Sequence, residues 1–201
     1  SAAGERMITE IKEAAKDGDS LGGIVEVLGY GVPVGLGSHV HWDRKIDAAI
    51  AQAVMSIQAV KSVEIGAGAH AAAVPGSEMH DALRVANGQI ERERNNAGGL
   101  EGGMTNGEPL VVRVAMKPIS TLMRPLGSVD LQTGDATEAH IERSDVCAVP
   151  SLAVIAEQVL ALTLAEMGFL GVAIPEEFGG AGAGHLELCV IAEEMGRANA
   201  P

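Results

Sequence analysis

The chain has 201 residues, with 27 acidic and 14 basic side chains that give a net charge of −13, and this length suits one domain or one and a half. Such a charge disfavours nucleic acids and anionic membranes as partners. One Trp, one Tyr and two Phe are too few for the stacking platforms that bind single-stranded nucleic acid, so the core must be aliphatic.

The cysteines and the beginning of the chain bear on the cellular compartment. Cys147 and Cys189 lie far apart and form no Cys-x-x-Cys motif, which fits a reducing environment. The polar, amphipathic start does not resemble a signal peptide. No uninterrupted apolar run reaches the roughly 18 residues of a membrane-spanning helix. We therefore expect a cytoplasmic protein without a membrane span.

The beginning of the chain predicts a helix, a strand and a second helix. Residues 5–16 carry apolar side chains on one helical face, and Gly18 should end that helix. Residues 24–28 predict a strand, which the glycine-rich region 29–37 closes with a turn. Asp43 can cap the second helix. The buried stripe of this helix is expected to contain Ile46, Ile50, Ala53, Val54 and Ile57.

The middle of the chain contains its most informative segment. A short strand at 62–65 and an irregular region at 66–88, rich in Gly, Ala and His, come first. Residues 95–109 then hold five glycines and three asparagines. Glycine lets a ligand approach the main chain, and asparagine tolerates left-handed backbone. We interpret the segment as a ligand-binding loop with exposed N–H groups; a long surface loop is the alternative.

The second half predicts two strands and two helices without strict strand–helix alternation. Residues 110–116 alternate between two faces, and 128–131 predict a second strand followed by a turn. Pro150 should begin a long apolar helix that Gly168 ends, and 186–195 predict another helix. The apolar stripe of the long helix is expected to contain Leu152, Ile155, Val159, Leu162 and Leu164. This mixture indicates the α+β class.

Two short polar motifs are candidates for chemistry. The first follows the strand at 110–116 and consists of Lys117, Pro118, Ile119, Ser120 and Thr121. A lysine and two hydroxyls at a strand end can hold a phosphate or an electron-rich ring edge; solvated polar residues are the alternative. The second motif places Arg143, Ser144 and Asp145 side by side. Arginine recognises phosphate or carboxylate with two parallel hydrogen bonds, whereas a surface ion pair is the simpler reading.

Other site types find little support in the sequence. His39 and His41 could place two imidazoles on one strand face, but no carboxylate or cysteine stands at a supporting spacing. We therefore read both as loop residues and expect no metal site. The nucleophile-elbow, Walker A, zinc-protease and dinucleotide-binding motifs do not occur, although Ser–His–Asp catalysis stays open.

Six motifs in register resemble the C-terminal part of chorismate synthases, especially those of actinobacteria. They are DGDSLGG at 17–23, PVGLG at 33–37, MSIQAVK at 55–61, NNAGGLEGGMTNGEP at 95–109, KPIST at 117–121 and RSDVCAVP at 143–150. We therefore assign residues 1–165 to a chorismate synthase-like region. The tail at 166–201 resembles the N-terminal helical segment of acyl-CoA dehydrogenases, and we expect it to be helical and of different origin.

The resemblance implies a partial β-α-β sandwich and a lyase of the shikimate pathway. Chorismate synthases eliminate phosphate from 5-enolpyruvylshikimate 3-phosphate with reduced FMN, as homotetramers. The implied catalytic residues are Asp145, which assists proton abstraction, and Arg143. The implied FMN contacts are Gln58, Ala59, Gly102, Lys117, Pro118, Ile119, Ser120, Thr121 and Arg143.

The sequence departs from the resemblance in what it lacks. The family's N-terminal half is absent, with its GESHG-type motif, two histidines and the arginines that hold the substrate. Glu93 also replaces a residue that is small in the family. We therefore expect the isolated chain to bind FMN weakly and not to turn over substrate. A non-catalytic fragment or interaction module is the alternative function.

Overall fold

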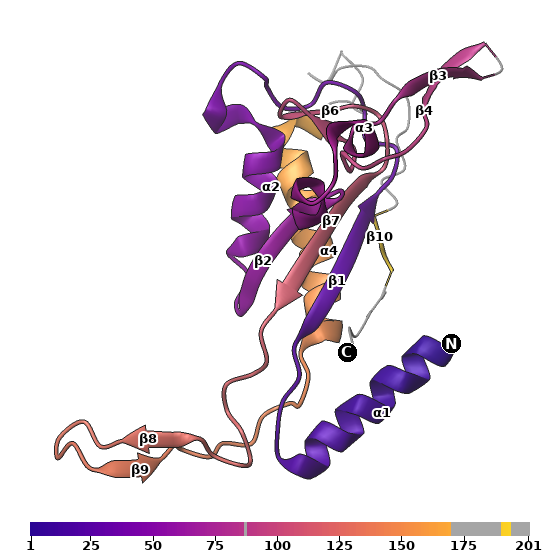
Figure 1. Ribbon diagram of the computed structural model, residues 1–201. Helices are drawn as coiled ribbons and strands as arrows, with labels where there is room; N and C mark the ends of the chain where they lie inside the picture. The colour runs from indigo at the N-terminus through magenta and orange to yellow at the C-terminus, as the bar shows by residue number, and fades with distance from the viewer. Residues whose placement is uncertain (87, 170–189, 194–201) are drawn as a thin grey trace.

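The structure, a computed structural model, describes residues 1–86, 88–169 and 190–193. Its centre is a four-stranded antiparallel sheet with the strand order β10-β1-β7-β2, and two helices cover one face of it (Figure 1). The strands are β1 (Gly23–Gly29), β2 (Val60–Ile65), β7 (Leu110–Met116) and β10 (Val190–Glu193). Helices packed on an antiparallel sheet confirm the predicted α+β class.

The sheet has one buried face because its central strands alternate. In β7, the side chains of Leu110, Val112 and Val114 are buried, as the sequence predicted. Val25 and Val27 of β1 pair with Val114 and Val112, so their side chains lie on the same face. This register places one continuous aliphatic surface under the helices.

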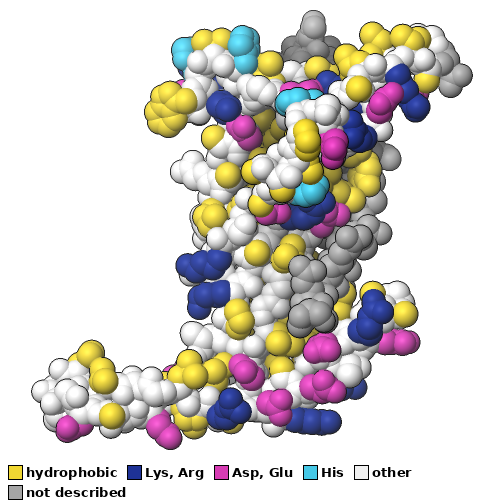
Figure 2. Space-filling model, viewed as in Figure 1, with side chains coloured by type: hydrophobic (Ala, Val, Ile, Leu, Met, Phe, Trp, Pro, Cys, Tyr) yellow, Lys and Arg dark blue, Asp and Glu magenta, His cyan; other side chains and the backbone are white. Residues whose placement is uncertain are grey.

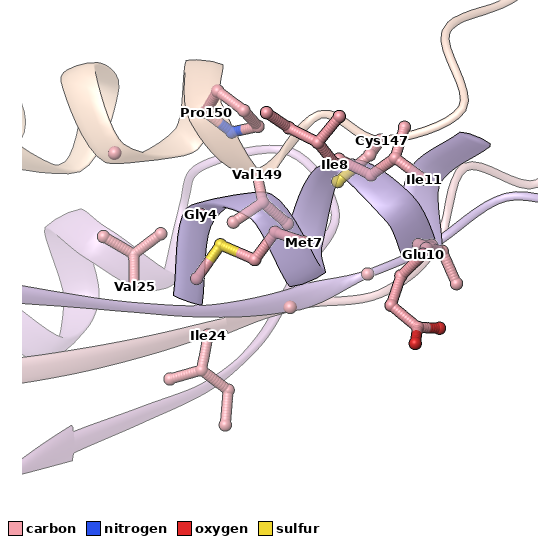
Figure 3. A pocket seen from close by; sticks show the side chains of 14 residues that line it. Gly4, Met7, Ile8, Glu10, Ile11, Ile24, Val25, Cys147, Val149 and Pro150 are labelled. Carbon is pink, nitrogen blue, oxygen red and sulfur yellow. The ribbon is translucent and has the colours of Figure 1, made fainter. Parts of the chain in front are cut away.

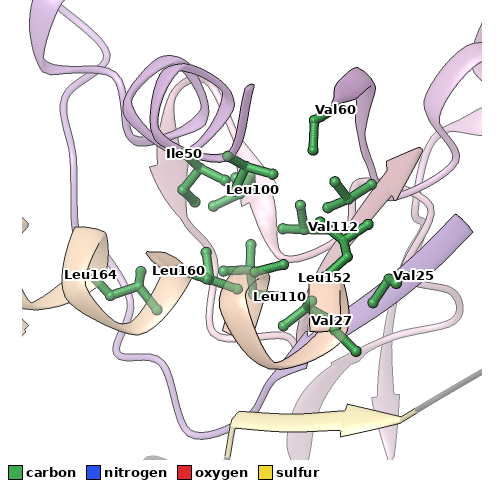
Figure 4. Packing of buried hydrophobic residues seen from close by; sticks show 14 of the residues in the cluster. Val25, Val27, Ile50, Val60, Leu100, Leu110, Val112, Leu152, Leu160 and Leu164 are labelled. Carbon is green, nitrogen blue, oxygen red and sulfur yellow. The ribbon is translucent and has the colours of Figure 1, made fainter. Parts of the chain in front are cut away.

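The two covering helices are α2 (Ile46–Met55) and α4 (Val149–Leu164). The core between them and the sheet is entirely aliphatic (Figure 4). Its buried members are Val25, Val27, Val32, Ile46, Ile50, Val54, Val60, Leu100, Leu110, Val112, Val114, Leu152, Ala153, Ala156, Leu160 and Leu164. The low aromatic content therefore does not prevent a dry core, since branched aliphatic side chains fill it.

The predicted N-cap of α2 is wrong. Asp43 lies in a 3-10 helix, η1 (Trp42–Arg44), and the cap position belongs to Lys45, whose side chain makes no capping bond. Instead, the first helical N–H, that of Ile46, donates to the carbonyl of Gly103 at 3.0 Å. A distant loop satisfies this N–H group, so the local capping signal was not needed.

Helix α4 differs from its predicted stripe. Leu152 and Leu164 are buried as expected, but Ile155 and Leu162 are exposed by 47% and 64%. The α-helix ends at Leu164 and continues into a π-helical turn, η3 (Ala165–Phe169), which contains the predicted terminator Gly168.

Length and composition alone would let the helix at Val149–Met167 cross a membrane, a possibility that the sequence reading did not anticipate. The expectation of no membrane span was based on unbroken apolar runs, whereas polar residues such as Glu157 interrupt the apolar run of this helix. The side chains of Leu152, Leu160 and Leu164 are buried in the core formed with the sheet. A core helix meets the same length and composition criteria, so this finding is weak support for a membrane span.

Helix α1 (Ala2–Asp17) confirms the prediction at 5–16. Its terminator Gly18 adopts the left-handed conformation, with φ of 70°. No residue of α1 is buried, and Figure 2 shows acidic and basic side chains together along it, at the lower right.

Three two-stranded hairpins complete the described structure. They are β3 (Leu83–Ala86) with β4 (Gln89–Arg92), β5 (Leu100–Glu101) with β6 (Met104–Thr105), and β8 (Gly127–Val129) with β9 (Ala136–Glu138). The region 66–88 is also more regular than predicted, because it contains η2 (Gly68–Ala72), α3 (Gly76–Met79) and β3.

The helix predicted at 186–195 is wrong where the structure describes that region. Residues Val190–Glu193 form β10, which pairs antiparallel with β1. Edge pairing satisfies backbone groups of β1 that a helix would leave open, so tertiary context decides this segment. The rest of the predicted helix lies outside the described residues.

The turn between β8 and β9 gives a pH-dependent prediction. The Asp130 carboxylate accepts N–H groups of Gln132 at 2.7 Å and of Thr133 at 3.1 Å, and these bonds lower its pKa below 3.8. The open turn then binds the proton more tightly than the closed turn. The contribution to hairpin stability is therefore present above the ordinary pKa and lost as the pH falls through the lowered one.

An NMR titration of the Asp130 carboxyl should have its midpoint below 3.8. The amide shifts of Gln132 and Thr133 should follow the same midpoint, and Asp130→Asn should abolish their response in this range. A midpoint at or above the ordinary value would contradict the proposed turn bonds.

Candidate functional site

Several predicted site residues meet at the end of β7. The segment 117–121 leaves β7 there, and the Lys117 N–H donates to the carbonyl of Ala59 at 2.9 Å. The hydroxyl of Ser20, a buried side chain, donates to the carbonyl of Ile119. Segments from two distant regions of the sequence therefore hold this motif in place.

The second predicted motif joins the same end. The Ser144 hydroxyl donates to the carbonyl of Thr121 at 3.1 Å, and the Leu21 N–H donates to the carbonyl of Val146 at 2.8 Å. We call this assembly, residues 18–21, 58–59, 117–121 and 143–146, the Lys117 corner. The structure thus brings together the KPIST and RSD motifs, which the sequence separates by more than 20 residues.

The backbone of Ala59 is unusual. With a φ of 68°, Ala59 is the only non-glycine residue in the described part of the chain that has a positive φ. Such a conformation costs of order 1–3 kcal/mol for a residue with a side chain, and it often marks functional sites. The Ala59 carbonyl accepts the Lys117 N–H, so the unusual turn directly positions the lysine segment.

Three cations lie in or next to the Lys117 corner. Lys117, Arg124 and Arg143 are all exposed, and the Arg124 N–H donates to the carbonyl of Gly18 at 2.9 Å. Within residues 1–86 and 88–169, none of the three side chains forms a salt bridge. The corner therefore presents positive charge that an anionic group can use, beside the exposed carboxylate of Asp145.

Gly102 lies away from this corner. It occupies the turn between β5 and β6, where the neighbouring Gly103 carbonyl contacts the start of α2. The same loop packs against the start of β7, whereas Lys117 follows its end (Figure 1). Seven strand residues span about 20 Å, so one copy of the chain does not bring Gly102 to Lys117.

The glycine-rich segment is held mainly by internal hydrogen bonds. The Asn95 amide donates to the carbonyl of Pro109 at 2.8 Å, and its oxygen accepts the N–H of Gly99 at 2.9 Å. Gly98 packs so closely on Gly66 that a side chain at Gly98 would lie 2.3 Å from the Gly66 nitrogen. Much of the glycine and asparagine content therefore serves packing; the ligand-binding role stays a prediction that concerns exposed Gly102.

Asp81 is a structural residue that the sequence reading missed. Its two carboxylate oxygens accept the N–H groups of Asn96 at 2.8 Å and of Ala97 at 2.9 Å. It thereby satisfies two N–H groups that we had expected to face a ligand. No local signal could have shown this, because the contact spans about 15 residues of irregular chain.

An apolar pocket of about 250 Å³ borders the corner. It lies between α1, the start of β1 and the start of α4, and Figure 3 shows the Glu10 carboxylate pointing away from it. Its lining includes Met7, Leu21, Val25, Cys147 and Val149. The pocket therefore offers apolar surface beside the cations rather than a second set of charges.

A metal site finds no support in the described part of the chain. His39 and His41 are both exposed in the loop before α2. In residues 1–86, 88–169 and 190–193, no three His, Cys, Asp or Glu side chains gather closely enough to hold an ion.

Comparisons with known proteins agree with the motifs at the corner. The sequence model described as chorismate synthase matches residues 1–169, and the one described as the N-terminal domain of acyl-CoA dehydrogenase matches residues 150–201. The chorismate synthase of Moorella thermoacetica is 59% identical over 179 residues, which are 89% of this chain and 45% of that protein. The chorismate synthase of Saccharopolyspora erythraea is 57% identical over 181 residues, covering 89% and 44%.

A solved structure supports the same relationship. A structure titled "Crystal Structure of Chorismate Synthase" superposes with a TM-score of 0.67 at 45% identity, covering 88% of this chain and 44% of that one. The chain thus spans less than half the length of the relatives that it matches.

Gly66 and Gly102 have similar backbone conformations but different surroundings, so together they test how much close packing contributes to stability. Gly66 and Gly102 have φ of 57° and 61°. A side chain at Gly66 would lie 2.1 Å from the Asn96 carbonyl oxygen, whereas one at Gly102 would meet nothing within 4 Å. Gly102→Ala should cost about 1–2 kcal/mol of unfolding free energy from backbone strain alone. Gly66→Ala should cost about 1–3 kcal/mol more, because the backbone must move.

Urea unfolding followed by circular dichroism measures both changes. Equal losses for the two variants would contradict the close packing of Gly66 against the glycine-rich segment.

Proposed function

We propose a function from one premise: this chain belongs to the chorismate synthase family. We infer that it supplies the C-terminal part of a cytoplasmic chorismate synthase. That enzyme eliminates phosphate from 5-enolpyruvylshikimate 3-phosphate, by a 1,4-anti elimination, with reduced FMN as cofactor. The observation that carries this proposal is the Lys117 corner, where the KPIST and RSD motifs meet although they are distant in sequence.

The side chains of the corner suit the binding of the phosphate group of FMN. The exposed ammonium of Lys117 offers a point charge, and the exposed guanidinium of Arg143 offers paired donors to phosphate or carboxylate. Ser120 and Thr121 add hydroxyls beside them. FMN, when bound, would supply an electron-rich ring for the elimination. Gln58 and Pro118 are also exposed here and are proposed to border the cofactor.

The remaining residues of the corner act by position and by proton transfer. Asp145 is exposed next to Arg143, and we assign its carboxylate oxygens the role of accepting a proton. Ser20 is a positioning residue, because its hydroxyl holds the Ile119 carbonyl from outside the site. Ala59 fixes the start of the lysine segment through its own carbonyl.

A single copy of this chain does not form a complete site. Gly102 lies at the opposite end of β7 from Lys117. We therefore propose that Gly102 of a second copy joins the corner, in the homotetramer that the family resemblance implies. The net charge of −13 is consistent with further cations for two anionic ligands coming from elsewhere.

A non-catalytic fragment or interaction module is the second candidate function. It is favoured by one observation: Gly102 and Lys117 lie at opposite ends of β7, so the implied flavin contacts do not meet in one copy of the chain. A helical protein of the acyl-CoA dehydrogenase kind is not supported, because the four-stranded sheet forms the centre of the described structure.

Flavin titration distinguishes the two candidates. FMN fluorescence should show saturable binding to the purified chain, and Lys117→Ala or Arg143→Ala should weaken it about tenfold or more, since a charge-assisted hydrogen bond contributes about 1.5–3 kcal/mol. Arg6→Ala, which removes an exposed cation of α1, is the matched control and should bind normally. Absence of saturable binding would favour the interaction module.

The isolated chain should form no chorismate when reduced FMN and substrate are supplied. Robust turnover by this chain alone would show that the proposed incompleteness is wrong.

A further inference from the structure

Lys61 occupies an irregular point of the edge strand β2. The register between β2 and β7 shifts there, because Val60 pairs with Met116 whereas Ser62 pairs with Ala115. Lys61 is therefore the extra residue of a β-bulge. Bulges re-aim side chains and are frequent beside active sites. This one begins directly after Ala59 of the Lys117 corner, so a functional role for its lysine is a natural hypothesis.

The bulge directs Lys61 away from the core. In a regular strand, side chains on one face are an even number of residues apart. Val60 and Val63 are three residues apart, yet Val60 is buried and Val63 packs against the same core. The extra residue reconciles this spacing and leaves both Lys61 and Ser62 on the outer face of the sheet. Without the bulge, Lys61 would point inward with Val63, where an ammonium group is costly to bury.

Lys117 lies on the same outer face, close to Lys61. Met116 packs against the core, so the alternation of the strand turns Lys117 outward. The Lys117 N–H donates to the Ala59 carbonyl at 2.9 Å, which extends the pairing of β2 and β7 by one residue. Lys61 and Lys117 therefore stand diagonally across the Val60–Met116 pair, a spacing of about 7–8 Å in antiparallel strands. In Figure 2, basic side chains gather at the left, near the end of the sheet where Lys117 follows β7.

The acidic side chains of this face are placed elsewhere. The register puts Glu26, Arg113 and Glu64 in one row across three strands. The Glu26 carboxylate contacts the Arg113 Nε at 2.7 Å, and Glu64 is three residues from Lys61, a span of roughly 10 Å. Among the described residues, neither Lys61 nor Lys117 forms a salt bridge. Neighbouring ammonium groups repel each other, and an anion bound between them would relieve that repulsion.

We propose that Lys61 is a second phosphate-binding lysine of the flavin site and that it gives the Lys117 corner a preference for phosphorylated flavin. This proposal rests on the proposed function and adds the residue that recognises the phosphate. Two lysine side chains at this spacing can both reach one phosphate, each as a point charge. The positive φ of Ala59 and the bulge at Lys61 together set where the two charges lie.

An edge lysine also has an ordinary structural use. Its charge hinders the pairing of an exposed strand with another chain. That use needs no ligand and predicts no effect of Lys61 on flavin binding. A measurement of phosphate recognition therefore separates the two roles.

Fluorescence titrations of the full chain with FMN and with riboflavin, which lacks the phosphate, test the proposal. Lys61→Ala should weaken FMN binding about fivefold, the upper range for an exposed charge pair, and leave riboflavin binding unchanged. Lys61→Arg keeps the positive charge and should restore FMN binding. Lys12→Ala, which removes an exposed lysine of α1, is the matched control and should bind both flavins as the unchanged chain does.

The outcomes separate this proposal from the proposed function. Unaltered FMN affinity in Lys61→Ala would overturn the role of Lys61 and leave the proposed function standing. An equal loss of riboflavin affinity would overturn it as well, since Lys61 would then act on the fold. Absence of FMN binding by the unchanged chain would contradict the proposed function. In that case an NMR titration with inorganic pyrophosphate decides: saturable shifts at Lys61 and Lys117 support the paired lysines, and no shift overturns them.

Discussion

Strand β7 fixes the geometry on which the rest of the molecule depends. It pairs with β1 on one side and β2 on the other, and its inward side chains form part of the hydrophobic core under α2 and α4. Its two ends hold the two conspicuous motifs, with the glycine-rich segment before it and the KPIST motif after it. The strand is extended and rigidly paired, so it separates these motifs by roughly its own length. Residues close in sequence therefore end on opposite sides of the domain.

In the Lys117 corner, contacts to the main chain hold the candidate site together. The Ala59 carbonyl and the hydroxyls of Ser20 and Ser144 each bind a main-chain group of the segment 117–121. These contacts leave the charged side chains of Lys117 and Arg143 exposed. The corner is thus shaped before any ligand arrives, which lowers the entropic cost of binding. Its apolar neighbour, the pocket at α1, extends the same edge of the molecule.

The helix layer is apolar on both of its sides. One face of α4 contributes Leu152, Leu160 and Leu164 to a dry core. The other face exposes Ile155 and Leu162, although the sequence marks them as equally apolar. In the described residues, the sheet therefore covers one side of these helices.

The sequence by itself determined the elements whose periodicity is local, such as α1 with Gly18 and the alternation of Leu110, Val112 and Val114 in β7. It also determined the family, because several motifs keep their order and spacing. Only tertiary structure decided the conformation of Val190–Glu193, where the open edge of β1 prevailed over helical spacing. It likewise decided the role of the glycine-rich segment, through Asp81 and the close approach to Gly66. Periodicity records which side chains share a face, whereas hydrogen bonds between distant segments depend on where the folded chain brings those segments together.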